Sequence, residues 1–283
     1  MIQKLRNNVL TRFNNKSILI DYFFENSAKP KPIVLFCHGY KGFKDWGAWN
    51  LVADTFAKAG FFFVKFNFSH NGGTMEQPID FPDLQSFGEN NYSKELDDLQ
   101  FVIHHITDSS FSFSSEVNTE HISLIGHSRG GGIVTITAAE NKKITQIVSW
   151  AGVSDYAVRF PKGTALEDWK TKGVMYVTNG RTKQQMPHYY QFFEDFQANA
   201  KRLHIEKATQ KLTIPHLIIH GTNDSAVSME EARNLNHWNP NSELVLIENA
   251  DHVFGARHPW NESFLPNDLQ KVVQTTIDFI KNT

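Results

Sequence analysis

Apolar and polar positions follow two rhythms along this chain. Short, nearly continuous apolar runs predict strands over residues 18–24, 33–37, 61–66, 122–125, 144–150, 216–220 and 244–247. Amphipathic segments between most of them predict helices over residues 46–59, 93–106, 128–140, 229–238 and 267–281. This alternation favours an α/β fold with a mostly parallel central sheet flanked by helices. Before Pro30, polar and apolar residues alternate, which predicts antiparallel strands at one edge of the sheet.

The segment 151–211 breaks this rhythm. It is much longer than a normal connection between a strand and a helix, and connections of that length tend to be lids or binding elements. We therefore expect one domain, with an α/β core over 1–150 and 212–283 and an inserted cap or lid over 151–211, after the sixth strand. Within the cap, residues 174–186 predict a hairpin with a turn at Asn179-Gly180.

Bulky side chains are concentrated in this predicted cap. They are Tyr156, Phe160, Trp169, Met175, Tyr176, Met186, Tyr189, Tyr190, Phe192, Phe193 and Phe196. Either they only attach the cap to the core, or some of them form a wall of a substrate pocket, as is usual for a cap inserted at this point. Our candidate substrate-binding residues are Tyr156, Tyr176 and Met186 in the cap and Gly39 in the core.

Composition narrows the class of partner. The 28 basic and 30 acidic residues are interspersed and leave a formal net charge of −2, which argues against nucleic acid and against an anionic membrane as partners. A hydrophobic fraction of 40% over 283 residues supports a sizeable core. We therefore expect a monomer or homodimer that acts on a small molecule.

The cysteine content and the N-terminal residues indicate the cellular compartment of the protein. Cys37 is the only cysteine, which excludes an internal disulfide, and its place in the apolar run 33–37 favours a buried core thiol over a nucleophile. The first residues lack the apolar stretch of a secretory signal, and no window reaches the length of a membrane span. These features predict a soluble, cytoplasmic protein.

The pentapeptide Gly126-His127-Ser128-Arg129-Gly130 is the strongest chemical signal. It stands between the predicted strand 122–125 and the predicted helix 128–140, so a serine occupies the apex of a strand-turn-helix unit. This is the layout of a nucleophile elbow, in which the flanking glycines permit a tight turn that exposes the serine Oγ above the sheet edge. We expect Ser128 to be a nucleophile.

A serine nucleophile needs a base and an orienting carboxylate, and both are available at strand ends. Asp224 follows the run 216–220, and His252 follows the run 244–247. Groups at the carboxyl ends of parallel strands meet at one edge of a sheet, and the chain order Ser, Asp, His is the one expected for this layout. Asp224 could instead only cap a helix, but the next helix begins several residues later.

Other residues compete for these roles. Asp155 follows the strand that ends at Trp150 and is the alternative acid, while His258 is the other late histidine that could serve as base. Asp251 is expected to point elsewhere. His127 is expected to pack or hydrogen-bond beneath the elbow and to take no chemical step.

An acyl-transfer site must also stabilise an oxyanion. The backbone N–H after the nucleophile, that of Arg129, is one expected donor. Tyr40 N–H is the second candidate, because it lies in the glycine-bounded turn 38–42 that follows the strand 33–37. His38 is expected to brace that turn through a side-chain hydrogen bond. The sequence contains no cysteine/histidine cluster with zinc spacing, no P-loop and no dinucleotide fingerprint, so we expect neither a metal nor another cofactor.

Together these motifs resemble the α/β-hydrolase superfamily over almost the full chain, and its dienelactone-hydrolase-like and feruloyl (cinnamoyl) esterase-like branch in particular. The matching segments are His38-Gly39-Tyr40-Lys41-Gly42, Gly126-His127-Ser128-Arg129-Gly130-Gly131, His220-Gly221-Thr222-Asn223-Asp224 with Val227, and Asp251-His252. The resemblance implies a triad of Ser128, Asp224 and His252, an oxyanion hole of the Tyr40 and Arg129 amides, and a cap after the sixth strand. Dienelactone hydrolases proper use a cysteine where this chain has Ser128.

The expected activity is that of a serine hydrolase. Ser128 would attack a carboxylic ester of a small to medium acyl group, aromatic acyl groups included, and form an acyl-enzyme that water hydrolyses. A thioesterase, a peptidase and an acyltransferase of the same fold would use the same residues and differ in the leaving group or the acceptor. A non-catalytic ligand-binding protein of this fold is the alternative from another class, although such proteins usually lack a triad residue.

Overall fold

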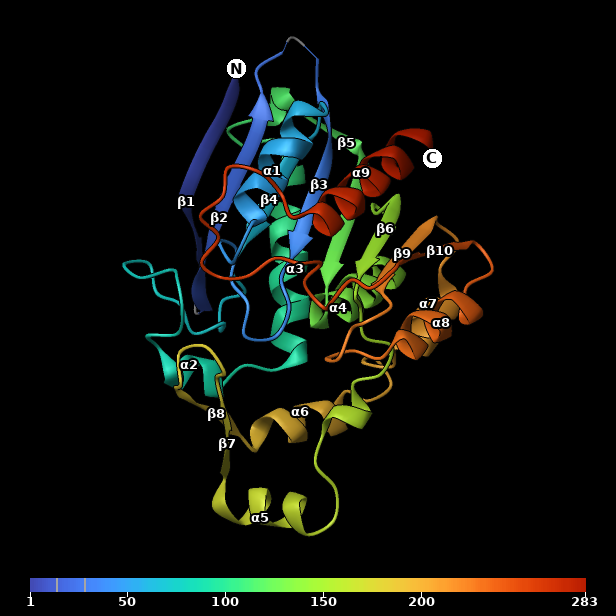
Figure 1. Ribbon diagram of the computed structural model, residues 1–283. Coiled ribbons are helices and arrows are strands. Elements are labelled where there is room, and N and C mark those ends of the chain that lie inside the picture. Colours follow the sequence, from blue (N-terminus) through green and yellow to red (C-terminus); the bar gives the residue numbers. More distant parts are fainter. Residues whose placement is uncertain (14, 28) are drawn as a thin grey trace.

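The computed structural model describes residues 1–13, 15–27 and 29–283. Its centre is an eight-stranded sheet in the order β1-β2-β4-β3-β5-β6-β9-β10 (Figure 1). The strands are β1 (Ile2–Arg12), β2 (Asn15–Glu25), β3 (Lys31–Cys37), β4 (Phe62–Phe66), β5 (Val117–His127), β6 (Gln146–Trp150), β9 (His216–Gly221) and β10 (Ser242–Ile247). β2 pairs antiparallel with β1 and β4, and the other pairs are parallel. The predicted α/β class and the antiparallel edge are confirmed.

Helices cover both faces of the sheet. The helices that flank it are α1 (Trp49–Lys58), α3 (Tyr92–Thr107), α4 (Arg129–Glu140), α8 (Met229–Trp238) and α9 (Asn267–Asn282). Side chains of β3 alternate between two buried clusters, because neighbouring residues of a strand point to opposite faces. Ile33, Leu35 and Cys37 pack with α3 and α4, whereas Val34 and Phe36 pack with α1 and α9. All five predicted helices are confirmed, with ends shifted by up to three residues.

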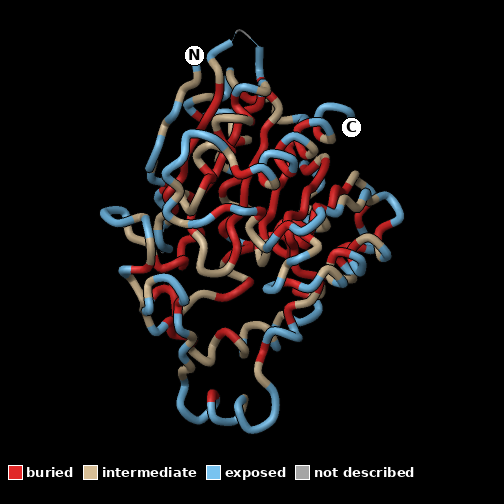
Figure 2. Tube along the Cα trace, viewed as in Figure 1, coloured by how far each residue is buried: buried red, intermediate tan, exposed pale blue. Residues whose placement is uncertain are grey.

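The segment 151–211, for which we keep the name cap as a label only, follows β6. It carries α5 (Thr164–Lys172), β7 (Val174–Thr178), β8 (Gln185–Tyr189), α6 (Gln191–Ala198) and α7 (Ile205–Lys211). Most of it projects beyond the carboxyl ends of the parallel strands, beside the short helix α2 (Leu84–Gly88) (Figure 1). α7 instead packs against α4 and α8. Figure 2 shows the central strands almost wholly buried, while buried and exposed residues mix in this outer segment.

The predicted hairpin forms, but its turn is longer than an Asn-Gly pair. β7 and β8 pair antiparallel, and residues 179–184 connect them. The Asn179 side chain accepts hydrogen bonds from Arg181 N and Thr182 N, and the positive φ of this loop falls on Lys183, at 62°, and not on Gly180. The asparagine therefore organises a wider loop through its side chain.

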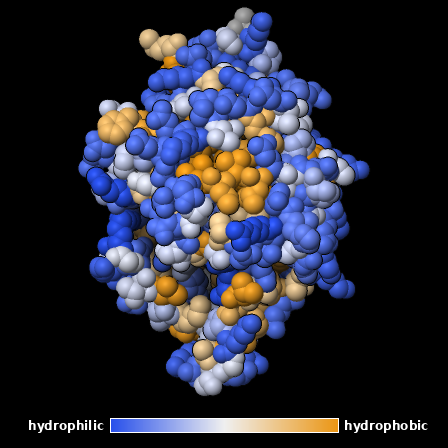
Figure 3. Space-filling view, turned by 45° about the vertical axis from the view of Figure 1, so that its right-hand side comes forward, coloured by the Kyte–Doolittle hydropathy of each residue, from blue (hydrophilic) through white to orange (hydrophobic). Residues whose placement is uncertain are grey.

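The surface shown in Figure 3 is mostly hydrophilic, and its largest hydrophobic patch lies near the centre of the view, with smaller ones toward the bottom. Within the part of the chain that the structure describes, no helix combines the length and apolar character required to cross a bilayer.

Buried histidines predict a strong acid sensitivity of the fold. Burial lowers the pKa of His38 to about 4 and the pKa values of His127, His188 and His216 to about 3. The unfolded chain binds a proton at each of these sites below about pH 6.5, whereas the folded chain does so only near pH 3 to 4. The free energy of unfolding is thus expected to fall between pH 6.5 and 4, by about 1.4 kcal/mol per pH unit for each group. Asp98 opposes this in part, since burial raises its pKa to about 6.

Urea unfolding at pH 7.5, 6.0 and 5.0 measures this slope. His216→Gln keeps a hydrogen-bonding partner for Ser149 and removes one titrating group, so its slope should be shallower by about 1.4 kcal/mol per pH unit. Equal unfolding free energies at pH 7.5 and 5.0 would contradict the prediction.

Candidate active site

Ser128 stands alone between β5 and α4, at the apex of a sharp turn. Its φ of +57° is a conformation that costs non-glycine residues about 1–3 kcal/mol, so the surrounding packing must impose it. A Cβ on Gly126 would lie 2.2 Å from the Gly130 carbonyl oxygen, and a Cβ on Gly130 would lie 2.5 Å from the Cys37 carbonyl oxygen. The flanking glycines are therefore required by close backbone contact, and the strained dihedral belongs to the serine.

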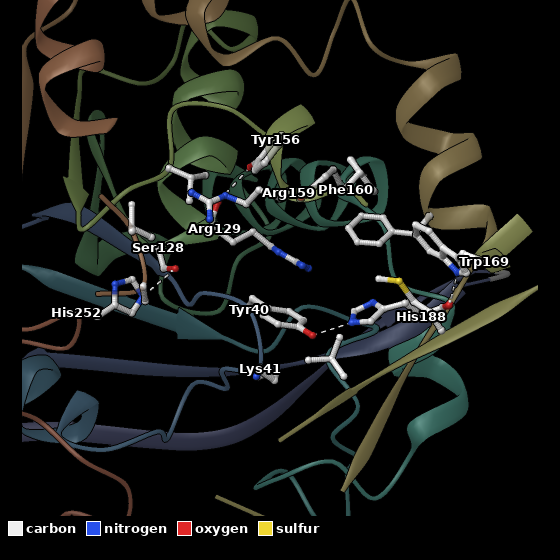
Figure 4. Close-up of a pocket in the computed structure, with 17 residues that line it drawn as sticks. Tyr40, Lys41, Ser128, Arg129, Tyr156, Arg159, Phe160, Trp169, His188 and His252 are labelled. Carbon is white, nitrogen blue, oxygen red and sulfur yellow. Dashed lines mark hydrogen bonds between the residues drawn. The ribbon is translucent and has the colours of Figure 1, made fainter. Parts of the chain in front are cut away.

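The structure brings Ser128, His252 and Asp224 together, and Figure 4 shows Ser128 beside His252. His252 Nε2 lies 3.0 Å from Ser128 Oγ, and His252 Nδ1 lies 2.7 Å from Asp224 Oδ2. Asp224 follows β9 and His252 follows β10, so neighbouring parallel strands deliver both groups to one edge. The other carboxylate oxygen, Asp224 Oδ1, accepts hydrogen bonds from Ala226 N and Val227 N at 2.8 and 2.9 Å. One oxygen thus shapes the loop and the other contacts the imidazole.

Two further histidines hold this arrangement. His220 Nε2 lies 3.3 Å from Asp224 Oδ2 and 2.9 Å from the Val227 carbonyl oxygen. Burial alone would raise the pKa of Asp224, but the hydrogen bonds from His220, His252 and Val227 N outweigh it and place this pKa well below its usual value. His127, whose pKa burial lowers to about 3, is neutral and donates from Nε2 to the His252 carbonyl at 2.9 Å. The packing role expected for His127 is confirmed.

The alternative acid, the alternative base and Asp251, all named from the sequence, have other roles in the structure. Asp155 Oδ1 accepts from Ala157 N, and Asp251 Oδ1 accepts from Val253 N and Gly255 N. His258 Nδ1 accepts from Gly47 N at 2.9 Å. Each is engaged with nearby backbone amides, and among the described residues none of the three side chains hydrogen-bonds with the side chain of Ser128 or His252.

The loop after β3 packs directly on the elbow. A Cβ on Gly39 would meet Ser128 Cβ at 2.8 Å, so only glycine lets the two loops approach this closely. His38 braces the loop as expected: its Nε2 accepts from Phe68 N at 3.3 Å, so its Nδ1 carries the proton and donates to the Gly39 carbonyl at 2.9 Å. Among the described residues, neither Tyr40 N nor Arg129 N donates to a protein acceptor. Both amides remain available to an oxyanion.

A cavity of about 420 Å³ opens at Ser128 and extends beneath the cap (Figure 4). Its lining consists of Tyr40, Lys41, Tyr92, Ser128, Arg129, Val153, Tyr156, Arg159, Phe160, Trp169, Met175, Val177, His188, Phe192, Ala226, Val227 and His252. Ser128 and His252 lie at one end of this view, and Trp169 and His188 lie at the other. A substrate bound here would have its reacting carbonyl at the core and the remainder against aromatic rings.

Of the candidate pocket residues from the cap, only Tyr156 lines this cavity. Its hydroxyl donates to the Arg129 carbonyl at 3.1 Å. Tyr176 does not line it: 60% of its surface is exposed, and the neighbours Met175 and Val177 face the cavity instead, because alternate residues of β7 point to opposite sides.

The two other candidates also lie outside the large cavity. Met186 is fully buried against Phe43, Phe81 and Phe87, where it attaches the cap to the core. Gly39 lines a smaller cavity of about 190 Å³, which shares Ser128 and His252 with the large one. The attachment role, and not a substrate wall, therefore applies to Met186.

Several polar residues of the cavity were missed by the sequence analysis. The Arg129 guanidinium lies 4.5, 5.2 and 5.4 Å from the ring centroids of Tyr40, Tyr92 and Phe192 and 3.3 Å from Glu95 Oε1. Only its position next to Ser128 could have drawn attention to this side chain.

His188 is a second residue that the sequence did not single out. It comes from β8 in the cap, and its Nε2 hydrogen-bonds with the Tyr40 hydroxyl at 2.7 Å. Trp169 Nε1 donates to the His188 carbonyl at 2.8 Å. This chain of contacts joins the cap to the loop that carries one of the two free amides.

A sequence model of the prolyl oligopeptidase family matches residues 49–280. No curated protein sequence matches the chain. Many solved structures match, and three of them illustrate the range.

Est1E from Butyrivibrio proteoclasticus, solved with ferulic acid bound, is 19% identical, with 94% of this chain and 95% of that chain covered and a TM-score of 0.68. Dienelactone hydrolase from Anabaena variabilis is 17% identical over 99% and 98% of the two chains, with a TM-score of 0.64. Acylaminoacyl peptidase from Pyrococcus horikoshii is 14% identical over 99% of this chain and 41% of that chain, with a TM-score of 0.67. These identities express a likeness of fold, and they confirm the predicted α/β-hydrolase fold.

Proposed function

The chain belongs to the prolyl oligopeptidase family of α/β-fold hydrolases, and from this premise we propose that it is a serine hydrolase that cleaves carboxylic esters through an acyl-enzyme. The single observation that carries the proposal is the contact series from Ser128 Oγ through His252 to Asp224, which opens into the cavity beneath the cap. A nucleophile, a base, an orienting carboxylate and a bounded space for the acyl group are the parts that acyl transfer requires.

The geometry suggests how each residue would act. Because His252 Nδ1–H donates to ionised Asp224, its Nε2 is left as the acceptor for the Ser128 proton. Ser128 Oγ then attacks the ester carbonyl, whose oxygen becomes negatively charged and accepts hydrogen bonds from the Tyr40 and Arg129 amides. His252 returns the proton to the leaving alcohol, and water repeats the cycle to release the acid.

The aromatic lining favours acyl groups with an apolar or aromatic body. Tyr92, Tyr156, Phe160, Trp169 and Phe192 contribute five aromatic rings to the lining of the cavity. The fold of Est1E, solved with ferulic acid, makes hydroxycinnamate esters suitable members of a first substrate panel. A peptidase is the second candidate, because the matching family and the acylaminoacyl peptidase of Pyrococcus horikoshii point to amide substrates.

A panel of substrates with different leaving groups tests the proposal. Methyl ferulate, 4-nitrophenyl acyl esters, an acyl-thioester and an acyl-aminoacyl 4-nitroanilide would be compared at equal enzyme concentration. We expect turnover of the esters, with a burst of 4-nitrophenol equal to the enzyme concentration when deacylation is slow. Cleavage of the anilide with no turnover of esters would replace the esterase by a peptidase.

Gly39→Ala is expected to lower kcat for ester hydrolysis by about 10²- to 10³-fold, the usual effect of losing one oxyanion donor. The added Cβ would stand 2.8 Å from Ser128 Cβ and 3.0 Å from the His127 carbonyl oxygen, so the loop that carries Tyr40 N must move away. Gly180→Ala is the matched control, since a Cβ there has no atom within 4 Å. Unchanged kcat in Gly39→Ala would show that this loop makes no contribution to the reaction.

A further inference from the structure

The charges on the wall of the large cavity are of one sign. Lys41, Arg129 and Arg159 line it, and none of the described lining residues is an aspartate or glutamate. A cavity whose other walls are mostly apolar and aromatic concentrates the field of such cations, because walls of low dielectric constant screen it weakly. A neutral aromatic acyl group would make no use of this charge.

Two of the three cations pair with a glutamate that does not itself line the cavity. Arg129 pairs with Glu95 at 3.3 Å, and Arg159 pairs with Glu231. Lys41 has no such partner among the described residues. Burial lowers the pKa of Lys41, and the positive charge of Arg129 lowers it further, with no carboxylate acting in the opposite direction. One positive charge of the cavity is therefore uncompensated.

Lys41 and Arg129 lie against the same side chain. The Lys41 Nζ is 5.0 Å and the Arg129 guanidinium carbon 4.5 Å from the centroid of the Tyr40 ring (Figure 4). The charge of Arg129 lowers the pKa of Lys41, so the two cations repel each other, and an anion placed near both would relieve that repulsion. Of the five N–H donors of Arg129, only one bonds within the described residues, to Glu95. Free donors for a ligand are thus present on both cations.

The other polar groups of the cavity are engaged or neutral. The Tyr40 hydroxyl bonds with His188, and the Tyr156 hydroxyl bonds with the Arg129 carbonyl. His188 carries no charge near neutral pH, since burial lowers its pKa to about 3. Lys41 and Arg129 are therefore the groups left to select a charged substrate.

These cations lie close to the reaction centre. Arg129 follows Ser128 directly, and Lys41 lines both the large cavity and the smaller one, which meet at Ser128 and His252. A negative group that reached both cations would be separated from the reacting carbonyl by a short spacer.

We propose that Lys41 and Arg129 form an anion subsite that selects esters whose acyl group carries a second, ionised carboxylate, that is, monoesters of short dicarboxylic acids. The inference rests on the proposed esterase function. With methanol as leaving group, the acyl part is the only portion large enough to occupy the cavity beneath the cap.

Hydrolysis of monomethyl succinate, glutarate and adipate, followed by proton release, tests the subsite against methyl valerate, an uncharged ester of similar length to monomethyl glutarate. At least one charged ester is expected to exceed methyl valerate by tenfold or more in kcat/KM. In Lys41→Gln this ratio should fall by about tenfold, and Lys41→Arg should restore most of it. Lys170→Gln, which removes an equal charge from the exposed face of α5, should leave the ratio as in the wild type.

The outcomes separate this inference from the esterase proposal. Hydrolysis of methyl valerate as fast as of every charged ester would overturn the subsite and leave the esterase standing. If no methyl ester is cleaved, the esterase proposal fails, and binding decides the subsite: glutarate should raise the melting temperature of the wild type more than valerate does, and not in Lys41→Gln. Equal shifts by glutarate and valerate would also overturn the subsite.

Discussion

Replacement of Ser128 by alanine is expected to lower kcat for ester hydrolysis by about a million-fold, the scale observed when the serine of a comparable triad is removed from subtilisin. The variant retains the Tyr40 and Arg129 amides and the cavity, so KM should change little and a small residual rate above that of water should persist. The effect is this large because no other hydroxyl lies within hydrogen-bonding distance of His252 Nε2 among the described residues.

Steady-state kinetics with a 4-nitrophenyl ester measure the loss, and an unchanged melting temperature would show that Ser128→Ala folds. Ser109→Ala, at an exposed serine in the loop after α3, is the matched control and should keep full activity. Mass spectrometry of protein quenched during turnover should find the acyl group on the peptide that contains Ser128. A kcat of Ser128→Ala equal to that of the wild type would contradict the assignment of Ser128 as the nucleophile.

Asp224→Asn is expected to lower kcat by about 10⁴-fold, the scale found for the corresponding change in other serine hydrolases. Asp224 Oδ1 accepts N–H groups from Ala226 and Val227, so an asparagine must place its carbonyl oxygen there and its NH₂ at the Oδ2 position. The NH₂ group then faces His252 Nδ1 and forces it to act as an acceptor. His252 would carry its proton on Nε2, toward Ser128, where it could not accept the serine proton.

The readout is kcat with KM largely retained, because the change alters a tautomer and leaves the cavity intact. Asp251→Asn and Asp155→Asn are the controls, since within the described part of the chain both carboxylates bond only to nearby backbone amides, and each should stay within a few-fold of the wild type. A larger loss in Asp155→Asn than in Asp224→Asn would transfer the acid role to Asp155.

Most of the fold could be predicted from the sequence because its signals are local. Residues 33–37 of β3 and 217–219 of β9 are short, wholly buried apolar runs. α8 was predicted with the bounds that it has in the structure, because Ser228 provides a side-chain cap just before it. The elbow was recognisable for the same reason: a strand, a serine between close-packed glycines and a helix are consecutive in the chain.

The partners of Ser128 were also within reach of sequence reasoning. Asp224 and His252 follow neighbouring parallel strands, and the carboxyl ends of such strands converge whatever the details of packing. The reason for the glycines was less well predicted. Gly126 and Gly130 make room for backbone atoms, and the positive φ belongs to Ser128 itself.

The chain's own sequence thus determined the layers of the fold, the position of the elbow and the three groups that meet there, because each follows from residues that are adjacent or at strand ends. Only the tertiary structure decided which side chains line the cavity. The alternation of side chains along β7 points Met175 and not Tyr176 into the cavity. The pairing of Arg129 with Glu95 leaves Lys41 as the cation without a carboxylate partner among the described residues. Contacts of this kind join distant segments, so they depend on register and packing that no local pattern contains.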